Sequence, residues 1–213
     1  MKTIKKIIGI FAVMNGVGLG VAVFLQTHLG SDPIGILCEG VHKSLNIQFG
    51  HASLLYNFLL IGLAFVCAKK NLGIGSIAYA LLSGYFIEFY SWILSASQLA
   101  SWVFTIRLLV FILGLFVFTM SLAVLIRFEF GMNALDALLY QLSTQIKIPY
   151  VVLRLLVDYL YVLVGYQLGG IFGIGSVICV LTSGLLIKGF NTLLTNKERA
   201  GRKGTRRYTS NEV

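Results

Sequence analysis

The sequence predicts an all-helical integral membrane protein composed of two tandem homologous repeats. Of its 213 residues, 57% are hydrophobic and 12% are charged, which leaves too few polar side chains to cover a water-soluble globule of this size. Several apolar segments reach the length of about 20 residues that crosses a bilayer. Short motifs also recur at a fixed spacing along the chain, as in a duplicated sequence. These observations exclude a soluble enzyme.

The repeat rests on motifs that match between the two halves. Two identical pairs lie 100 residues apart, namely Gly73–Ser76 with Gly173–Ser176, and Ser83–Gly84 with Ser183–Gly184. A weaker match lies 101 residues apart, between Gly30–Asp32 and Gly131–Asn133. We therefore predict a first membrane repeat over residues 1–101, a second over residues 102–195 and a basic cytoplasmic tail over residues 196–213.

Each repeat contains four apolar elements in the same order. They cover residues 7–27, 33–46, 51–68 and 73–95 in the first repeat, and residues 104–127, 134–146, 149–167 and 174–194 in the second. The first, third and fourth elements are long enough to span. Gly16 and Gly20 have GxxxG spacing, which predicts close helix packing. The glycines that begin the fourth elements are interpreted in the same way, although their N–H groups also suit an anion site.

The second element of each repeat is short and polar. It carries Glu39, His42 and Lys43 in one repeat and Gln141 and Gln145 in the other, side chains that are costly in contact with lipid. If this element does not cross, each repeat has three spans plus one re-entrant helix, and the two repeats are inverted. If it crosses, the protein has eight spans in parallel repeats. Length and polarity favour six spans with inverted repeats, a plan found in transporters, and eight spans stay the alternative.

The net charge of +9 comes largely from the two ends of the chain. Basic residues precede the first apolar element and follow the last one: Lys2, Lys5, Lys6, Lys197, Arg199, Arg202, Lys203, Arg206 and Arg207. Because basic residues beside spans mark the cytoplasmic side, we predict that both termini are cytoplasmic. Topology explains these charges, so nucleic acid is not an expected partner, whereas anionic lipid headgroups are suited to the tail.

Both short elements begin with residues typical of a helix N-terminus. Asp32 precedes Pro33 in the first, and Asn133 is followed three residues later by Asp136 in the second. One interpretation is capping of the free N–H groups. The other is that two half-helix N-termini converge near the middle of the membrane and face a substrate or ion. Recurrence at equivalent positions supports the second interpretation, and both stay open.

Two charges lie inside an apolar segment of the second repeat. Arg154 and Asp158 are four residues apart and hence on one helix face. Such charges usually point into the bundle, so the pair is either a structural salt bridge or part of a translocation path. Their counterparts at the 101-residue offset are Ser53 and Asn57. The candidate residues of a substrate path are Asp32, Asn57, Asn133, Asp136, Arg154 and Asp158.

No motif indicates catalysis, a cofactor or a metal. The sequence has no P-loop, HExxH or GxSxG pattern and no paired catalytic carboxylates. Cys38, Cys67 and Cys179 are far apart in apolar stretches, which predicts core thiols rather than metal ligands. We therefore expect no enzymatic activity, no cofactor and no metal site.

Four features carry a family resemblance over nearly the whole chain: Gly30–Pro33, Gly50, Gly73–Ser76, and Ser83–Gly84 with its second copy. With them the chain resembles the YczE/YyaS/YitT family of bacterial multi-spanning membrane proteins, although Ser76 and Ser176 stand where that family usually has Thr. The resemblance implies a transporter-like protein of the bacterial cytoplasmic membrane and names no substrate.

We therefore predict a transporter or permease for a small solute or ion. The alternative is a non-transporting scaffold, or an accessory or substrate-binding subunit of a larger membrane complex. A homo-oligomer or a membrane partner is compatible with either. A cavity that reaches the N-termini of the short helices distinguishes the two, because a scaffold would pack that space.

Overall fold

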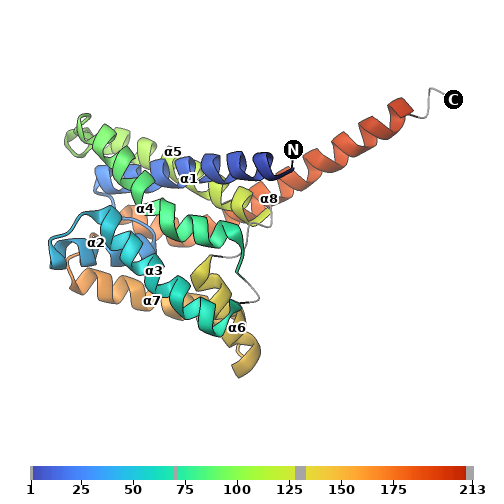
Figure 1. The fold of residues 1–213 in the computed structure, drawn as a ribbon. Coiled ribbons are helices and arrows are strands. Elements are labelled where there is room, and N and C mark those ends of the chain that lie inside the picture. The colour runs from blue at the N-terminus through green and yellow to red at the C-terminus, as the bar shows by residue number, and fades with distance from the viewer. Residues whose placement is uncertain (1, 70–71, 128–132, 210–213) are drawn as a thin grey trace.

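The computed structural model describes residues 2–69, 72–127 and 133–209, with side chains described for residues 8–69, 72–73, 76–125 and 133–193. Over these residues the chain forms eight α-helices, one short 3-10 helix and no strand (Figure 1). In chain order they are α1 (Lys2–Thr27), α2 (Pro33–Leu45), α3 (Phe49–Cys67), α4 (Ile74–Ser95), η2 (Leu99–Ser101), α5 (Phe104–Arg127), α6 (Ala134–Ile146), α7 (Tyr150–Gln167) and α8 (Ile174–Thr209).

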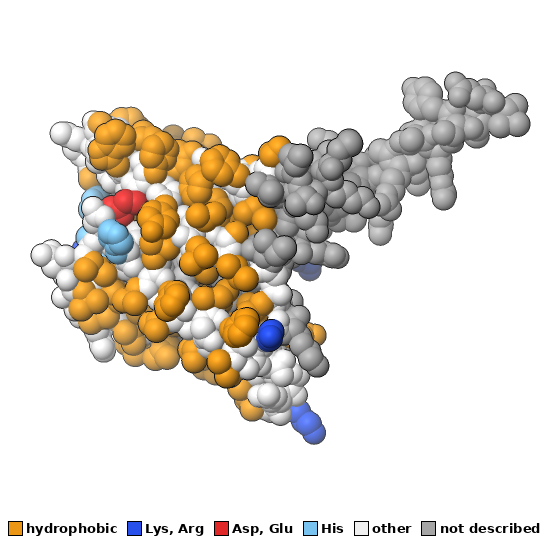
Figure 2. All heavy atoms as spheres, viewed as in Figure 1, with side chains coloured by type: hydrophobic (Ala, Val, Ile, Leu, Met, Phe, Trp, Pro, Cys, Tyr) orange, Lys and Arg blue, Asp and Glu red, His pale blue; other side chains and the backbone are white. Residues whose placement is uncertain are grey.

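Six of these helices are long and apolar enough to cross a membrane, and they are the six that the sequence predicts: α1, α3, α4, α5, α7 and α8. Helices α2 and α6 have 13 residues each. At 1.5 Å per residue they extend about 20 Å, less than the about 30 Å of a bilayer core. Hydrophobic side chains cover most of the face seen in Figure 2. The chain is an integral membrane protein.

Helix α8 differs most from the prediction. It was expected to end near residue 194, but its backbone stays helical to Thr209 and projects away from the bundle (Figure 1). Residues 195–209 contain no proline and include several good helix formers. Their basic residues also suit a helix C-terminus, where the macrodipole is negative. Most of the predicted tail therefore continues the last span as a helix.

The interior of the bundle centres on α1, which packs against α4 and α5. Glycines allow this close approach, as the GxxxG spacing predicts. A Cβ atom added at Gly20 would lie 2.7 Å from Cβ of Phe118 and 3.0 Å from the carbonyl oxygen of Gly114. A Cβ atom added at Gly16 would lie 2.0 Å from Oγ of Ser121. Close packing at Gly16 and Gly20 is thus confirmed.

Helices that the sequence offset of 100–101 residues pairs with each other run in opposite directions. Figure 1 shows this for α1 and α5, for α3 and α7, and for α4 and α8. The N-terminus and the projecting end of α8 lie on the same side of the bundle. The short helices α2 and α6 lie toward opposite ends of it (Figure 1).

The loop before α2 is joined to the start of α8 by backbone contacts. The N–H of Gly175 donates to the carbonyl of Leu29 over 2.8 Å, and the N–H of Ser31 donates to Oγ of Ser176 over 3.1 Å. Gly30 has a φ of +101°, a conformation that favours glycine. The second GIGS motif therefore packs against the first half, as predicted. The corresponding loop of the second half includes Gly131 and Met132, which lie outside the described residues.

The polar side chains of α2 are paired within the protein. Glu39 is 7% exposed and accepts a 3.0 Å hydrogen bond from the N–H of Ile171, in the loop before α8. Lys43 forms a 2.9 Å ion pair with Glu39 and donates to the carbonyl of Gly169 over 3.0 Å. These contacts fix the C-terminal half of α2 and leave its N-terminus to face the interior.

Candidate functional site

A cavity of about 500 Å³ lies inside the bundle and is lined by residues of all eight α-helices or their first turns. Its lining includes every residue that the sequence nominated for a substrate path: Asp32, Asn57, Asn133, Asp136, Arg154 and Asp158. A volume in this range suits a small organic ligand. The six residues come from four separate helices or helix starts, so the fold brings them together across long sequence distances.

The N-termini of α2 and α6 both reach this cavity. Asp32 and Asn133 occupy the N-cap positions, and Pro33 is the first residue of α2. The helix starts are therefore where the sequence predicts them. Of the two interpretations left open, side-chain capping is only weakly present, because neither Asp32 nor Asn133 makes a capping hydrogen bond of ordinary geometry and a weaker bond from the N–H of Gly35 reaches Asp32. Instead, Oδ1 of Asp32 accepts a 3.1 Å hydrogen bond from the hydroxyl of Ser31.

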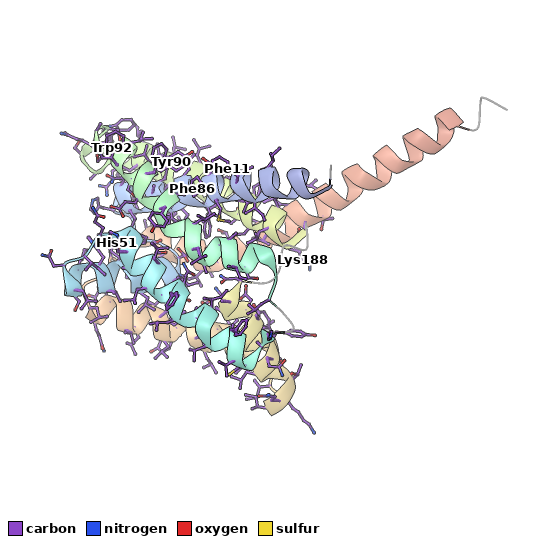
Figure 3. The ribbon with its side chains drawn as sticks, viewed as in Figure 1. Phe11, His51, Phe86, Tyr90, Trp92 and Lys188 are labelled. Atoms are coloured by element: carbon purple, nitrogen blue, oxygen red, sulfur yellow. The ribbon has the colours of Figure 1, made fainter. Side chains whose placement is uncertain are left out.

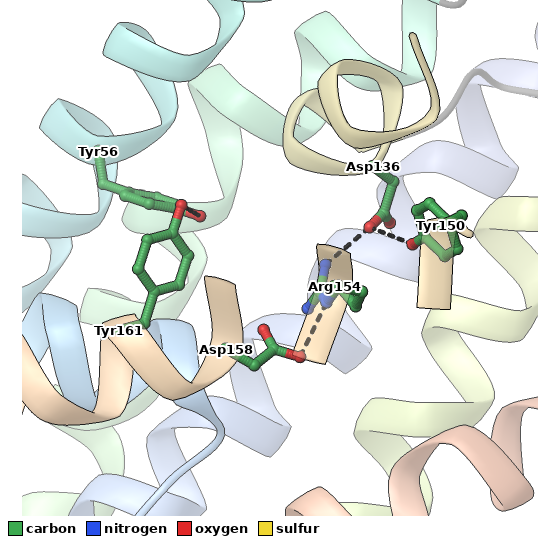
Figure 4. A network of polar contacts seen from close by, with 6 residues as sticks. All are labelled: Tyr56, Asp136, Tyr150, Arg154, Asp158 and Tyr161. Atoms are coloured by element: carbon green, nitrogen blue, oxygen red, sulfur yellow. Dashed lines mark hydrogen bonds and ion pairs between the residues drawn. The ribbon is translucent and has the colours of Figure 1, made fainter. Parts of the chain in front are cut away.

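Three charged residues form a chain along one wall (Figure 4). Nη1 of Arg154 lies 2.7 Å from Oδ1 of Asp136, and Nε of Arg154 lies 2.9 Å from Oδ2 of Asp158. The hydroxyl of Tyr150 donates to Oδ1 of Asp136 over 2.8 Å. The Arg154–Asp158 salt bridge is thus confirmed. Its extension to Asp136 explains why Asp136 does not cap α6, since charge-assisted bonds to a guanidinium and a phenol compete with capping.

One oxygen of this chain is left without a donor. Oδ1 of Asp158 is buried and accepts no hydrogen bond from any side chain or backbone group of the described residues. A buried carboxylate oxygen is normally hydrogen-bonded, because an unpaired one costs about 1–3 kcal/mol or more for a charged group. Asp158 therefore offers an acceptor to a ligand in the cavity that it lines.

The part of the facing wall that α3 and α4 form is polar but uncharged. The amide of Asn57 donates to Oγ of Ser83 over 3.2 Å and to Oγ of Ser53 over 3.4 Å. The hydroxyl of Tyr56 donates to that of Tyr161 over 3.3 Å, which links α3 to α7 (Figure 4). The cavity thus has a hydroxyl–amide network on the α3–α4 side and ion pairs on the α6–α7 side, and Asp32 is the charged residue that the first half adds.

Asp32 has an altered tendency to ionise. Burial raises the pKa of its carboxyl group above the ordinary value of 3.8, and the negative charge of Asp158 adds to this, while the hydrogen bond from Ser31 and the charge of Arg154 oppose it. Among the described side chains, no Lys or Arg lies within ion-pair distance of Asp32. Asp32 is therefore a carboxylate without a basic partner at the start of α2.

The cavity reaches the outside between α7 and α8. Leu155 on α7 and Val180 on α8 both line it, yet they are 58% and 46% exposed. A Cβ atom added at Gly184, which also lines the cavity, would meet nothing within 4 Å. This opening faces the region where lipid would surround the bundle, because both helices are membrane spans.

Several lining residues escaped the sequence analysis. Besides several aliphatic residues, they include five aromatic side chains: Phe49, Tyr56, Tyr79, Phe118 and Tyr150. A signal existed for two of them, since Tyr56 precedes Asn57 and Tyr150 lies four residues before Arg154, on the same helix face. The others give no sequence signal, because aromatic residues are common throughout these apolar helices.

The cysteines match the prediction in part. Cys38 and Cys179 are buried and line the cavity, whereas Cys67 is exposed near the end of α3, so its assignment to the core was wrong. An exposed thiol on a span is compatible with lipid, which an apolar side chain can face without cost. Over the residues that the structure describes, no group of three or more His, Cys, Asp or Glu side chains could hold a metal ion.

Comparison with known proteins gives a family. Residues 4–192 match the family described as "Family of unknown function (DUF6198)". The chain belongs to this DUF6198 family. It is 25% identical over 173 residues to the "Uncharacterized protein YyaS" of Bacillus subtilis, covering 81% of this chain and 85% of that protein. It is also 22% identical over 177 residues to an "Uncharacterized protein" of Haemophilus influenzae, covering 83% and 79%. No solved structure matches the chain.

The resemblance to YyaS is thus supported by a curated relative. Both relatives are bacterial proteins. The names of both relatives give no activity.

Proposed function

We propose that this DUF6198 protein is a transporter for a small solute, with the central cavity as its substrate site and path. The observation that carries the proposal is the position of the cavity: both short-helix N-termini and all intramembrane charges of its wall open into one space of about 500 Å³. Transporters commonly bind substrate between two repeats, at the ends of broken or short helices. The residues Asp32, Asn57, Asn133, Asp136, Arg154 and Asp158 are its proposed path.

Inverted repeats are part of this proposal. The helix pairs that the sequence offset relates run in opposite directions (Figure 1), as expected of two three-span units inserted from opposite sides. In this arrangement α2 and α6 are re-entrant helices that enter from opposite faces. The N-terminus and the end of α8 share one side, and their basic residues favour the cytoplasmic side of a bacterial inner membrane. Membership of the broader YczE/YyaS/YitT group belongs to the same proposal.

The alternative of a scaffold or accessory subunit is less well supported. A scaffold has no need for an interior cavity lined by four charged residues, and replacing such residues by apolar ones that fill the space would often be neutral or stabilising. A non-enzymatic role is also proposed, since Tyr150 and Asp136 are engaged with each other and with Arg154, and no other nucleophile–base pair is apparent among the described residues of the wall.

The experiment that tests transport needs no knowledge of the substrate. Ser183 lines the cavity on α8, so Ser183→Cys is introduced into a background in which Cys38, Cys67 and Cys179 are replaced. Right-side-out and inside-out membrane vesicles are treated with a membrane-impermeant thiol reagent. A transporter that alternates its access exposes the cavity to each side in turn, so labelling is expected in both kinds of vesicle. Lys69→Cys, expected at the cytoplasmic face, serves as the sidedness control.

If labelling of Ser183→Cys goes to completion from one side and does not occur from the other, alternating access is contradicted. That result would favour a scaffold or a one-sided receptor. External labelling of Lys69→Cys would overturn the six-span inverted topology and favour eight spans in parallel repeats.

A further inference from the structure

We propose that the cavity binds an organic monocation, whose positive group pairs with Asp32 and whose apolar body lies against the aromatic wall. This inference rests on the proposed function, because it names the class of substrate for the same cavity. It is carried by the charge of the lining, by the partners of those charges and by the aromatic side chains beside them.

The lining has an excess of negative charge. Three carboxylates, Asp32, Asp136 and Asp158, and one guanidinium, Arg154, are the charged side chains described in it, which leaves two formal negative charges when all are ionised. The N-termini of α2 and α6 each contribute about half a positive charge, so they offset about one of the two. About one negative charge remains, which matches a ligand with a single positive charge.

An anionic substrate is disfavoured by the partners of Arg154. Its Nη1 and Nε atoms are already bonded to Asp136 and Asp158, at 2.7 and 2.9 Å. An anion would have to use the remaining Nη2 atom or displace a carboxylate, and in either case it would lie beside Asp136 and Asp158, whose negative charges already pair with this guanidinium. A cation meets no such competition, because the oxygens that lack partners are acceptors.

Two acceptors are free to receive it. Among the described side chains, Asp32 is hydrogen-bonded only to the hydroxyl of Ser31, and Oδ1 of Asp158 is buried without any donor. Burial is the main cause that raises the pKa of Asp32, and repulsion by the carboxylate of Asp158 adds to it. A positive group placed in the cavity relieves this repulsion and supplies the missing counter-charge.

The remainder of the wall suits an organic body rather than a bare metal ion. Phe49, Tyr56, Tyr79, Phe118 and Tyr150 line the cavity. Aromatic faces attract cations within about 6 Å of the ring centroid, and they favour amines and quaternary ammonium groups. The hydroxyls of Tyr56 and Tyr150 already donate to Tyr161 and Asp136, so their rings are what they offer to a ligand. A metal ion would instead need several converging oxygen ligands.

The test uses the purified full-length protein in lipid nanodiscs. Binding of benzyltrimethylammonium, a soluble aromatic monocation, is measured by isothermal titration calorimetry at pH 8. Phenylacetate, an anion of similar size, is the matched probe. We expect the cation to bind at least tenfold more tightly than the anion. The variant Asp32→Asn is expected to lose at least tenfold in affinity for the cation. Glu88→Gln removes a carboxylate that does not line the cavity and should leave the affinity unchanged.

The dependence on pH is a second readout that needs no variant. Because burial raises the pKa of Asp32, its carboxyl group takes up a proton at a higher pH than an ordinary aspartate, and the cation then loses its counter-charge. Affinity should therefore fall in the wild type as the pH is lowered from 8, and the fall should be smaller in Asp32→Asn. Other titratable or charged groups that face Asp32 are Cys38 on α2, Tyr79 on α4, Arg154 and Asp158 on α7, and Cys179 on α8.

Binding of phenylacetate that is as tight as that of the cation, or tighter, overturns the proposal. The proposal is also overturned if no cation binding is detected at probe concentrations up to about 10 mM. Unchanged affinity in a folded Asp32→Asn variant overturns the role of Asp32. Labelling of Ser183→Cys from both sides without cation binding would leave transport standing and remove this substrate class. Cation binding together with labelling from one side only would support this ligand class and contradict transport.

Discussion

The α3–α4 pair and the α7–α8 pair occupy related positions in the two halves, yet one is closed and the other open. Between α3 and α4, a Cβ atom added at Gly84 would lie 2.5 Å from the carbonyl oxygen of Gly50 and 2.6 Å from Cγ of Leu54. At the related positions, Gly184 meets nothing within 4 Å and Leu155 is 58% exposed. The helices α7 and α8 are not among the helix pairs that pack closely against each other over the described residues.

A carboxylate closes the first pair and has no counterpart in the second. Oε2 of Glu88 on α4 accepts a 2.8 Å hydrogen bond from the N–H of Gly50, in the first turn of α3. The residue at the related position on α8 is Lys188, and a cation is unfavourable at the positive N-terminus of a helix. His51, next to Gly50, and Lys188 lie at opposite ends of the bundle (Figure 3).

The difference shows that α7 is held in the bundle by contacts other than those that hold α3. Where α3 packs along α4, α7 packs against α2 and is tied to α6 by the Arg154 ion pairs. The open pair gives the cavity its route to the outside, and the closed pair gives the bundle a rigid side. Under the proposed inverted arrangement, α7 and α8 would pack together as α3 and α4 do here when the cavity opens to the other side of the membrane.

The largest effect is expected from removing the ion pairs that replace helix packing. Arg154→Met leaves Asp136 and Asp158 without their cation, and breaking a buried pair in this way costs about 3–5 kcal/mol. Ser53→Ala, the related change in α3, removes one neutral hydrogen bond and should cost about 1 kcal/mol. Thermal unfolding in detergent measures both.

Replacing Arg154 and Asp158 together by Met and Leu should recover part of the stability, because Asp136 then keeps Tyr150 as its donor and only one carboxylate lacks a cation. A loss in Arg154→Met no greater than in Ser53→Ala would show that packing, not charge, holds α7.

Two matched glycine substitutions are expected to change the stability by smaller amounts and in opposite directions. Gly84→Ala should destabilise by about 1–3 kcal/mol, because the added Cβ atom meets backbone and forces α3 and α4 apart. Gly184→Ala should stabilise by up to about 1 kcal/mol, since alanine favours a helix and has open space there. The melting temperatures of the two purified variants give the comparison. A destabilised Gly184→Ala would mean that α7 and α8 close in the folded ensemble.

The smallest effect concerns the carboxylate that closes the first pair. Glu88→Leu leaves the N–H of Gly50 without its acceptor and should cost about 1–2 kcal/mol. Glu88→Gln keeps an acceptor and should lose only the charge contribution of about 0.3–1 kcal/mol. Lys188→Leu is the control at the related position and should change the melting temperature little. If the Gln and Leu variants lost equal stability, the negative charge rather than the hydrogen bond would be the stabilising feature.

The long helices and the starts of the short ones were predictable from the sequence, because hydropathy and helix-start residues are local signals. Pro33 and Asn133 stand at the ends where they were expected. The continuation of α8 to Thr209 was missed because the end of an apolar run was taken as the end of the helix.

The candidate residues of the site were identified as separate polar positions, but their partners were not. Asp136 joins Arg154 only because α6 packs against α7, and no sequence spacing encodes that distance. The open and closed helix pairs could not be predicted either, since the motif Ser83–Gly84 recurs unchanged at Ser183–Gly184. The same two residue types therefore pack in different surroundings in α4 and in α8.

The backbone contacts between the loop at Leu29–Ser31 and the start of α8 restrict how the halves can move. Gly175 and Ser176 hold this loop through hydrogen bonds of 2.8 and 3.1 Å, and the loop is too tightly fitted at Gly30 to accept a side chain. Any displacement of one half against the other must break these bonds or turn about them. If the two halves rotate relative to each other, this loop would lie at the axis of the rotation. The displacement of the backbone would then be largest at the ends of α3 and α8 that lie far from the loop.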